Sequence, residues 1–336
     1  METPESQQRP VARKAESQLL GLEQPIRCAF ALDPFGLDGP RIEAMQWAAT
    51  AFAGGRPVEI SPAGVLYPKP SRTAGTAETF WSQLEETRRT SLDESLHALG
   101  ARSENLSLAQ ATILTEPSRS KRSAAACLAK WAAAHGAEIL VVNTHGATAI
   151  ERLRLGSFAE ALLATSTVPV LALGPKCNPT SPTPIRTILV PTDFSERAEP
   201  HLGRAIALCK RLGAKLVLHH VFEPPTPPPT ATEMGIGFDN LWFQETWKES
   251  EERQRGLAGE WARIGEGEGI ATETIFDAAQ GDVPSKILAA TEASGADLVA
   301  MPSFRGPIGQ ALLGSVARDV VQGSERPVLV IHSESH

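Results

Sequence analysis

Short apolar runs rich in β-branched residues alternate along the chain with segments whose apolar residues recur at helical spacing. The pattern is clearest in the second half of the sequence. There the predicted strands are 187–191, 215–222, 271–278, 297–301 and 326–332, and the predicted helices are 197–213, about 240–264, 285–295 and 314–323. The first half follows the same order, with a weaker second strand at 58–66. Strands that alternate with helices predict a parallel sheet covered by helices on both faces, with ligands bound beyond the carboxyl ends of the strands.

The chain also repeats itself. Gly156-Ser157 recurs 158 residues later as Gly314-Ser315, and Pro169-Val170-Leu171 recurs at the same offset. A strand-like run ends in Asp33 in the first half and in Asp193 in the second. The period is too long for a solenoid and indicates a duplicated domain. The predicted organisation is a flexible tail at 1–24, a first domain at 25–174, a proline-rich linker at 175–185 and a second domain at 186–333.

The strongest local motif is Asn143-Thr144-His145-Gly146, followed after nine residues by Gly156-Ser157. It lies between a predicted strand and a predicted helix. Glycines there let backbone N–H groups approach an anion closely, and the helix N-terminus adds partial positive charge. Ser157 can bond a phosphate oxygen or cap the helix, so the glycine-serine pair that merely starts a helix remains the alternative.

These segments resemble the universal stress protein family. ILVPTDFS, LGSVARDVV and RPVLVIH in the second half carry the likeness most closely, and it extends over nearly all of both copies. The resemblance implies α/β domains, each a doubly wound parallel five-stranded sheet of strand order 3-2-1-4-5, Rossmann-like and adenine nucleotide alpha hydrolase-like. Many members of the family bind ATP through G-x2-G-x9-G-[S/T], and others lack the motif.

Both copies depart from that motif. Asn143 stands at the first glycine position of copy one, where asparagine tolerates positive φ better than most residues. In copy two, Met301 and Phe304 stand at the glycine positions when counted back from Gly314, and Pro302 with a one-residue deletion when counted from the strand. We therefore expect Met301 or Phe304 to fill the phosphate space of copy two, and ATP or another adenine nucleotide, with Mg²⁺ as its companion, to bind copy one.

The family's contact positions give a set of candidate nucleotide-binding residues. They are Asp33, Asn143, His145, Gly146, Gly156 and Ser157 in copy one, and Thr192, Asp193, Val221, Gly314 and Ser315 in copy two. An aspartate at a strand end is also a common helix cap. Taken alone, Val221 fits the core better than a site, and a solvent-facing loop position is the simpler interpretation of His145.

Other polar clusters are weaker candidates. His219 and His220 are adjacent on a predicted strand and point to opposite faces, which disfavours a shared metal ion. The basic run 118–122 follows the third strand of copy one, at the expected sheet edge, and is interpreted as a solvated helix start. The aromatic residues around Trp242 and Trp247 suit packing under the proline-rich stretch 224–230, with a partner surface as the alternative.

Composition narrows the function classes. The net charge of −7 disfavours a general nucleic-acid binder, and no apolar run is long enough to span a membrane. The polar N-terminus lacks the apolar segment of a secretory signal. The four cysteines are widely spaced, without a CxxC pair, which gives neither a zinc ribbon nor a disulfide framework and favours a cytoplasmic location.

Three functions remain open. The favoured one is a stress-response regulatory protein with one adenine-nucleotide site, and the second is an interaction or assembly protein with two vestigial pockets. The third, an enzyme such as a weak ATPase, lacks a paired base, a metal cluster and a P-loop lysine.

The resemblance also implies pairing through the fifth strands, here 168–173 and 327–332. Both are short and apolar, so we expect them to lie antiparallel within one chain. A dimer of whole chains stays open.

Overall fold

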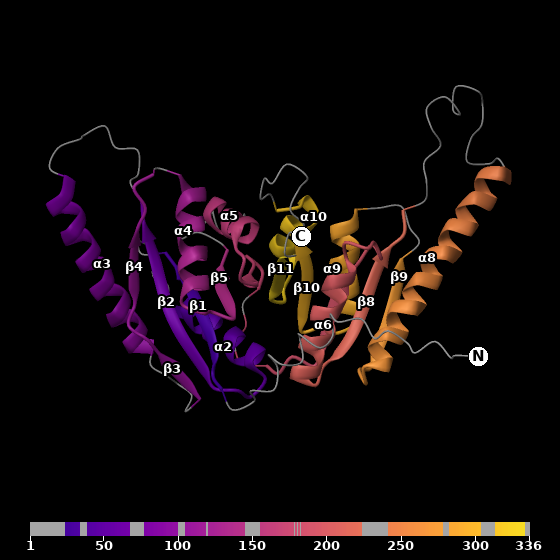
Figure 1. Ribbon diagram of the computed structural model, residues 1–336, viewed down its shortest axis with the longest axis horizontal. Helices are drawn as coiled ribbons and strands as arrows, with labels where there is room; N and C mark the ends of the chain where they lie inside the picture. The colour runs from indigo at the N-terminus through magenta and orange to yellow at the C-terminus, as the bar shows by residue number, and fades with distance from the viewer. Residues whose placement is uncertain are drawn as a thin grey trace, which may run out of the picture.

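The protein is described here from a computed structural model. The structure describes residues 24–33, 39–67, 77–99, 105–118, 120–144, 155–177, 179, 181, 183–223, 241–277, 282–303 and 313–332. Strands and helices alternate through these ranges, as the apolar periodicity predicts (Figure 1).

The first half of the chain forms one parallel α/β unit. Its strands are β1 (Ile26–Leu32), β2 (Val58–Leu66), β3 (Leu106–Leu108), β4 (Thr112–Thr115), β5 (Ile139–Asn143) and β6 (Val170–Leu173); its helices are α2 (Gly39–Ala53), α3 (Ala77–Leu99), α4 (Lys121–Ala134) and α5 (Ser157–Thr165). The third strand of the repeat is split into β3 and β4, and both pair with β2 in parallel. The spatial order β3-β2-β1-β5-β6 is the order 3-2-1-4-5 when β3 and β4 count as one strand.

The second half repeats this architecture. Its strands are β7 (Thr187–Pro191), β8 (Lys215–Val221), β9 (Thr272–Asp277), β10 (Leu298–Ser303) and β11 (Val328–His332); its helices are α6 (Glu199–Leu212), α8 (Leu241–Gly267), α9 (Val283–Ala293) and α10 (Ser315–Gly323). The order β9-β8-β7-β10-β11 is again 3-2-1-4-5, with parallel pairing throughout. The doubly wound α/β fold is therefore confirmed in both copies.

The two half-sheets join into one eleven-stranded sheet. β6 and β11 lie side by side and antiparallel, with Leu171 opposite Leu329. Both leucines are almost completely buried, at 1% and 3% exposure. We call this junction of β6 and β11, with the helices that pack over it, the seam. In Figure 1 the seam lies at the centre of the molecule, and α3 and α8 flank the two outer ends.

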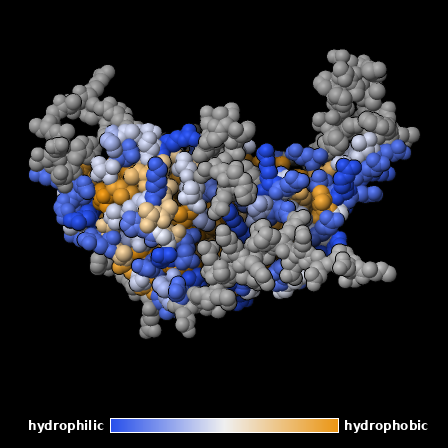
Figure 2. All heavy atoms as spheres, in the orientation of Figure 1, coloured by the Kyte–Doolittle hydropathy of each residue, from blue (hydrophilic) through white to orange (hydrophobic). Residues whose placement is uncertain are grey.

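Helices cover both faces of the sheet and bury two apolar layers. One layer packs the sheet against α2, α6 and α8, and it runs through both halves of the chain without a break. The other packs it against α4, α5, α9 and α10. Figure 2 shows hydrophilic side chains over the outer ends of the molecule, where α3 and α8 lie. Burial of both sheet faces explains why the central strands are apolar runs and do not alternate polar and apolar residues.

Local sequence signals fix the helix ends. α6 stops at Gly213, whose φ of 64° is left-handed and favours glycine, and α2 is followed by Gly54 with a φ of 62°. α9 begins two residues before its predicted start because the side chain of Asp282 accepts a hydrogen bond from Ser285 N at 3.1 Å. The repeat is thus kept in the caps of equivalent helices as well as in the strands.

Candidate nucleotide site

The predicted phosphate position of the first domain lies at the N-terminus of α5. Gly156 is the N-cap residue, and its N–H donates to Thr144 O at 2.8 Å. A Cβ at Gly156 would lie 3.3 Å from that same oxygen, so the two segments of the motif are in close contact. Within the described residues no side chain caps α5, and a helix N-terminus of this kind favours an anion.

Lys121 reaches this helix terminus. Its Nζ donates to Ser157 Oγ at 2.8 Å, and both side chains are exposed. Lys121 is the exposed first residue of α4, as expected of a solvated helix start. The expectation that the basic run 118–122 lies away from the phosphate position is wrong for this lysine. The strand before it does lie at the sheet edge, but α4 crosses back over the sheet and packs against α5. That crossover carries the N-terminus of α4 to the position where phosphate is expected.

The strand end of the motif is rigid. Thr144 is buried, and both its N–H and its Oγ1 donate to Leu173 O, at 3.0 and 3.1 Å. Asn143, at the first glycine position, is half-buried, and its Oδ1 is inaccessible to solvent and has no hydrogen-bond partner among the described residues. A buried amide oxygen of this kind is costly unless a loop or ligand group bonds it. His145 and Gly146 lie outside the described residues.

The predicted nucleoside side of the first domain lies at the ends of β1 and β2. Asp33 is exposed directly after β1. Burial raises the pKa of Tyr67, and the negative charge of Asp33 raises it further, so hydroxyl and carboxyl lie near one another. The strand register identifies the residue of β2 that corresponds to Val221, which the divergent sequence of β2 does not reveal. The equivalent residues Ala31 and Pro191 pair with Ala63 and His219, respectively. Two residues further along, Val65 is therefore the counterpart of Val221.

In the second domain the corresponding side chains build a turn. Thr192 Oγ1 accepts from Phe194 N at 3.0 Å, and Asp193 Oδ1 accepts from Ser195 N at 3.0 Å. Phe194 has a φ of 54°, the one positive φ among non-glycine residues of the described chain. Both hydrogen bonds hold this turn, while the Asp193 side chain remains exposed at the strand end. Val221 is half-buried at the end of β8.

An aromatic cluster backs this turn, and sequence reasoning missed it. The Phe194 ring lies 4.9 Å from His220 and 5.2 Å from Trp261, and His220 lies 5.3 Å from Phe276. The guanidinium of Arg255 lies 4.2 Å above the Phe276 ring. These residues come from four separate elements or their ends, so no local motif announces them. The cluster occupies the sheet face below α8 and stiffens the nucleoside end of the second domain.

The two adjacent histidines of β8 point to opposite faces, as predicted. His219 Nε2 lies 2.8 Å from Asp277 Oδ2, and burial lowers the pKa of His219. His220 lies on the other face, where its Nδ1 is 2.8 Å from Thr192 O. Among the described residues no group of three potential metal-ligating side chains comes together.

The phosphate end of the second domain differs from that of the first. Gly314 is the N-cap of α10 and Ser315 its first residue, as at α5. Leu171 and Leu329 are equivalent in the repeat, and they pair with Val141 and Ala300, respectively. Ala300 is therefore the counterpart of Val141. Two residues further along the strand, Pro302, and not Met301, is the counterpart of Asn143. The expectation that Met301 fills the phosphate space is wrong, since Met301 is 4% exposed and belongs to the apolar layer under the helices. Phe304 lies outside the described residues.

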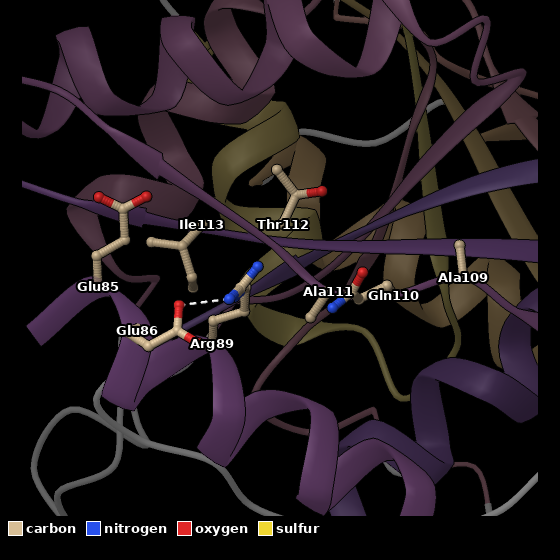
Figure 3. A pocket seen from close by; sticks show the side chains of 8 residues that line it. All are labelled: Glu85, Glu86, Arg89, Ala109, Gln110, Ala111, Thr112 and Ile113. Atoms are coloured by element: carbon tan, nitrogen blue, oxygen red, sulfur yellow. Dashed lines mark hydrogen bonds and ion pairs between the residues drawn. The ribbon is translucent and has the colours of Figure 1, made fainter. Parts of the chain in front are cut away.

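A separate hollow of about 720 Å³ lies at the outer edge of the first domain, between α3 and β4 (Figure 3). Its charged lining is partly neutralised, because Glu86 and Arg89, three residues apart on α3, form an ion pair along one wall. Ligand pockets are usually apolar with a few convergent polar groups, which this open hollow lacks. It contains none of the residues of the candidate nucleotide site.

The fold defines a class of tandem, doubly wound α/β proteins. The model of the universal stress protein family matches residues 28–174 and again 184–332. The chain therefore belongs to the universal stress protein family, as two tandem domains. A search of curated proteins found no match.

Solved structures with TM-scores above 0.5 agree on the fold. A universal stress protein from Archaeoglobus fulgidus DSM 4304 is 18% identical with a TM-score of 0.60, and the match covers 91% of this chain and 98% of that one. A functionally unknown protein from Pseudomonas aeruginosa PAO1 is 15% identical with a TM-score of 0.53, covering 93% and 94%. A universal stress protein from Archaeoglobus fulgidus in complex with dAMP is 22% identical with a TM-score of 0.31, covering 44% and 97%. Among the described residues no helix is long and apolar enough to cross a membrane.

Proposed function

We propose that this universal stress protein is a cytoplasmic regulatory protein that binds one adenine nucleotide, ATP or a close relative, in its first domain. The observation that carries the proposal is the meeting of Lys121 with Ser157 at the uncapped N-terminus of α5. A cation, a hydroxyl and the backbone N–H groups of a helix N-terminus at one point suit a phosphate group. The unpartnered Asn143 Oδ1 beside them supplies a further polar contact for a ligand or for the loop that covers it.

We further propose that the second domain keeps the nucleoside end of the site and has lost the phosphate end. Thr192 and Asp193 lie at the end of β7 in the family's manner, but Pro302 replaces the residue that starts the phosphate loop. Proline fixes φ and has no N–H to offer a phosphate. The expected stoichiometry is one triphosphate per chain, with Mg²⁺ entering as the companion of ATP.

The proposal is for binding and regulation without efficient catalysis. Burial raises the pKa of Cys177 and Cys209 to about 12, so both thiols stay protonated and are poor nucleophiles at neutral pH. All four cysteines are unpaired, which supports the reducing cytoplasm as the compartment. The domain limits 25–174 and 186–333 are part of the proposal, as is the persistence of the seam in solution within one chain.

Titration calorimetry with ATP tests the phosphate site. Replacing Lys121 by alanine is expected to weaken ATP binding about tenfold, because a charge-assisted contact is lost, and to leave adenosine binding unchanged. Lys130→Ala on the exposed side of the same helix is the matched control, with wild-type affinity expected. Gly146→Val, at the position that the motif reserves for glycine, is expected to abolish ATP binding.

Two results would count against the proposal. Equal ATP affinity in wild type and Lys121→Ala would remove the lysine from the site. If the wild-type chain neither releases an adenine nucleotide on denaturation, as measured by mass spectrometry, nor binds ATP in the calorimeter, the proposal fails. The alternative of an assembly protein with two vestigial pockets, which the extensive seam favours, would then hold.

A further inference from the structure

The seam has an internal two-fold relation. Leu171 and Leu329 are directly opposite one another and are the same position of the repeat. Around such an axis, a residue near the centre faces its own equivalent in the other copy. If two identical domains paired in this way, each central residue would meet a copy of itself. The residues that surround the axis are not identical in the two copies, and their differences are complementary.

The first central pair is electrostatic. Glu160 of α5 and Arg318 of α10 are equivalent, each being the fourth residue of its helix. They form an ion pair across the seam, with side chains 34% and 43% exposed. Two first domains paired in the same way would place Glu160 against Glu160, and two second domains would place Arg318 against Arg318.

The second central pair is more deeply placed. The buried positions of α2 and α6 align at an offset of 160 residues, Ile42 with Leu202 and Ala49 with Cys209, so the counterpart of Phe52 is Leu212. The guanidinium of Arg211 lies 4.5 Å from the centre of the Phe52 ring, and its Nη1 donates to Phe52 O at 2.7 Å. Burial lowers the pKa of Arg211 to about 10, so this buried guanidinium depends on the partners around it. Two second domains paired in the same way would offer it Leu212 in place of the phenyl ring.

The third difference is one of size. His332 and Gly174 are equivalent positions. His332 lies against Leu163 of α5, and Gly174 lies against Val321 of α10, which is the position equivalent to Leu163. His332 Nε2 is 2.5 Å from Leu163 O, whereas a Cβ at Gly174 would lie only 1.9 Å from Val321 O. A histidine therefore fits against the first domain, and only glycine fits against the second. Two second domains would place His332 where the space admits no side chain.

We infer that these three pairs make the seam specific for unlike halves, so that each domain accepts the other domain of its own chain and rejects a second copy of itself. The partner that fits the exposed fifth strand of the first domain is the second domain. Attraction in the unlike pair and repulsion or overlap in the like pairs act together. The joining linker raises the local concentration of the correct partner and completes the selection.

The axial leucines provide a direct readout in the full-length chain. In Leu171→Cys/Leu329→Cys, the unlike pairing brings the two new thiols together, and oxidation with diamide is expected to give a disulfide within one chain. In Leu171→Cys alone, a disulfide-linked dimer would require two first domains to pair. We expect at least tenfold less of this dimer than of the intrachain product, on non-reducing gels and by mass spectrometry. The wild-type chain, with its four native thiols, is the background control.

Complementarity is tested by exchange of the Phe52 and Arg211 side chains in the double-cysteine chain. Phe52→Arg is expected to slow intrachain cross-linking about tenfold, because two guanidinium groups then meet in a partly buried site. Arg211→Phe added to Phe52→Arg is expected to restore the rate, which a chain that had merely misfolded would not do. Glu160→Arg, and its rescue by Arg318→Glu, are expected to give a smaller effect of about twofold.

Two outcomes would overturn the inference. One is an equal rate for Phe52→Arg and for the exchanged pair Phe52→Arg/Arg211→Phe. The other is a disulfide dimer of Leu171→Cys that forms as readily as the intrachain product. Both measurements are independent of nucleotide, so their failure would leave the proposed ATP site untouched.

Discussion

Replacing Gly174 by alanine is expected to destabilise the protein by about 3 kcal/mol. An ideal Cβ at this position would lie 1.9 Å from Val321 O and 3.1 Å from Val321 C, and both are backbone atoms of the opposite domain. A flexible side chain could move aside, but here the whole helix α10 must retreat from β6. Gly174 does not have a positive φ, so the penalty is entirely steric.

Urea unfolding followed by circular dichroism measures this change. Gly203→Ala is the matched control, because a Cβ at that exposed position in α6 meets nothing within 4 Å. The same substitution is therefore expected to stabilise the protein there, by about 0.5 to 1 kcal/mol, through the helix preference of alanine. A Gly174→Ala protein as stable as wild type would show that the domains do not approach one another this closely.

Lowering the pH from 7 to 4 is expected to remove about 3 kcal/mol of stability through His201 alone. The side chain of His201 is buried in α6, at 4% exposure. Burial, together with the nearby charges of Arg204 and His332, lowers its pKa to about 4. Because the unfolded chain has the ordinary pKa of about 6.5, it binds the proton more tightly than the folded protein. The contribution is therefore complete above pH 6.5 and is lost as the pH falls towards 4.

The test compares the urea midpoints of wild type and His201→Phe between pH 7 and 4 at constant ionic strength. Phenylalanine keeps most of the buried volume and cannot be protonated. The variant is expected to lose less stability on acidification than wild type, with the difference confined to the range below pH 6.5. If the two proteins lost stability in parallel, His201 would not be the group whose protonation is suppressed.

Much of the architecture could be predicted from the sequence because its signals are local. Apolar runs gave the strands, and cap residues such as Gly213 fixed the helix ends within a few residues. The family resemblance supplied the strand order and the candidate phosphate position at Gly156. These features depend on neighbours along the chain, so one sequence is enough to read them.

What could not be predicted depends on distant segments. Lys121 reaches Ser157 only because α4 crosses the sheet and packs beside α5. The choice between Met301 and Pro302 as the counterpart of Asn143 needed the strand register, because the deletion falls in the following loop. The aromatic cluster around Phe194 likewise joins residues from separate elements. In each case the residue carries no recognisable local motif. Its role depends on which distant residues the helix crossover or the strand pairing brings next to it.

The central position of the seam has a consequence for synthesis of the protein. Leu171 leaves the ribosome 158 residues before its partner Leu329. At about 5 to 20 residues per second, the apolar strand β6 stays without its partner strand for roughly 8 to 30 s. Neighbouring nascent copies on one messenger RNA expose the same edge over the same interval. A first domain that does not pair with another first domain therefore limits cross-assembly between growing chains. When the second domain has been synthesised, its strand β11 pairs with β6 and covers this edge.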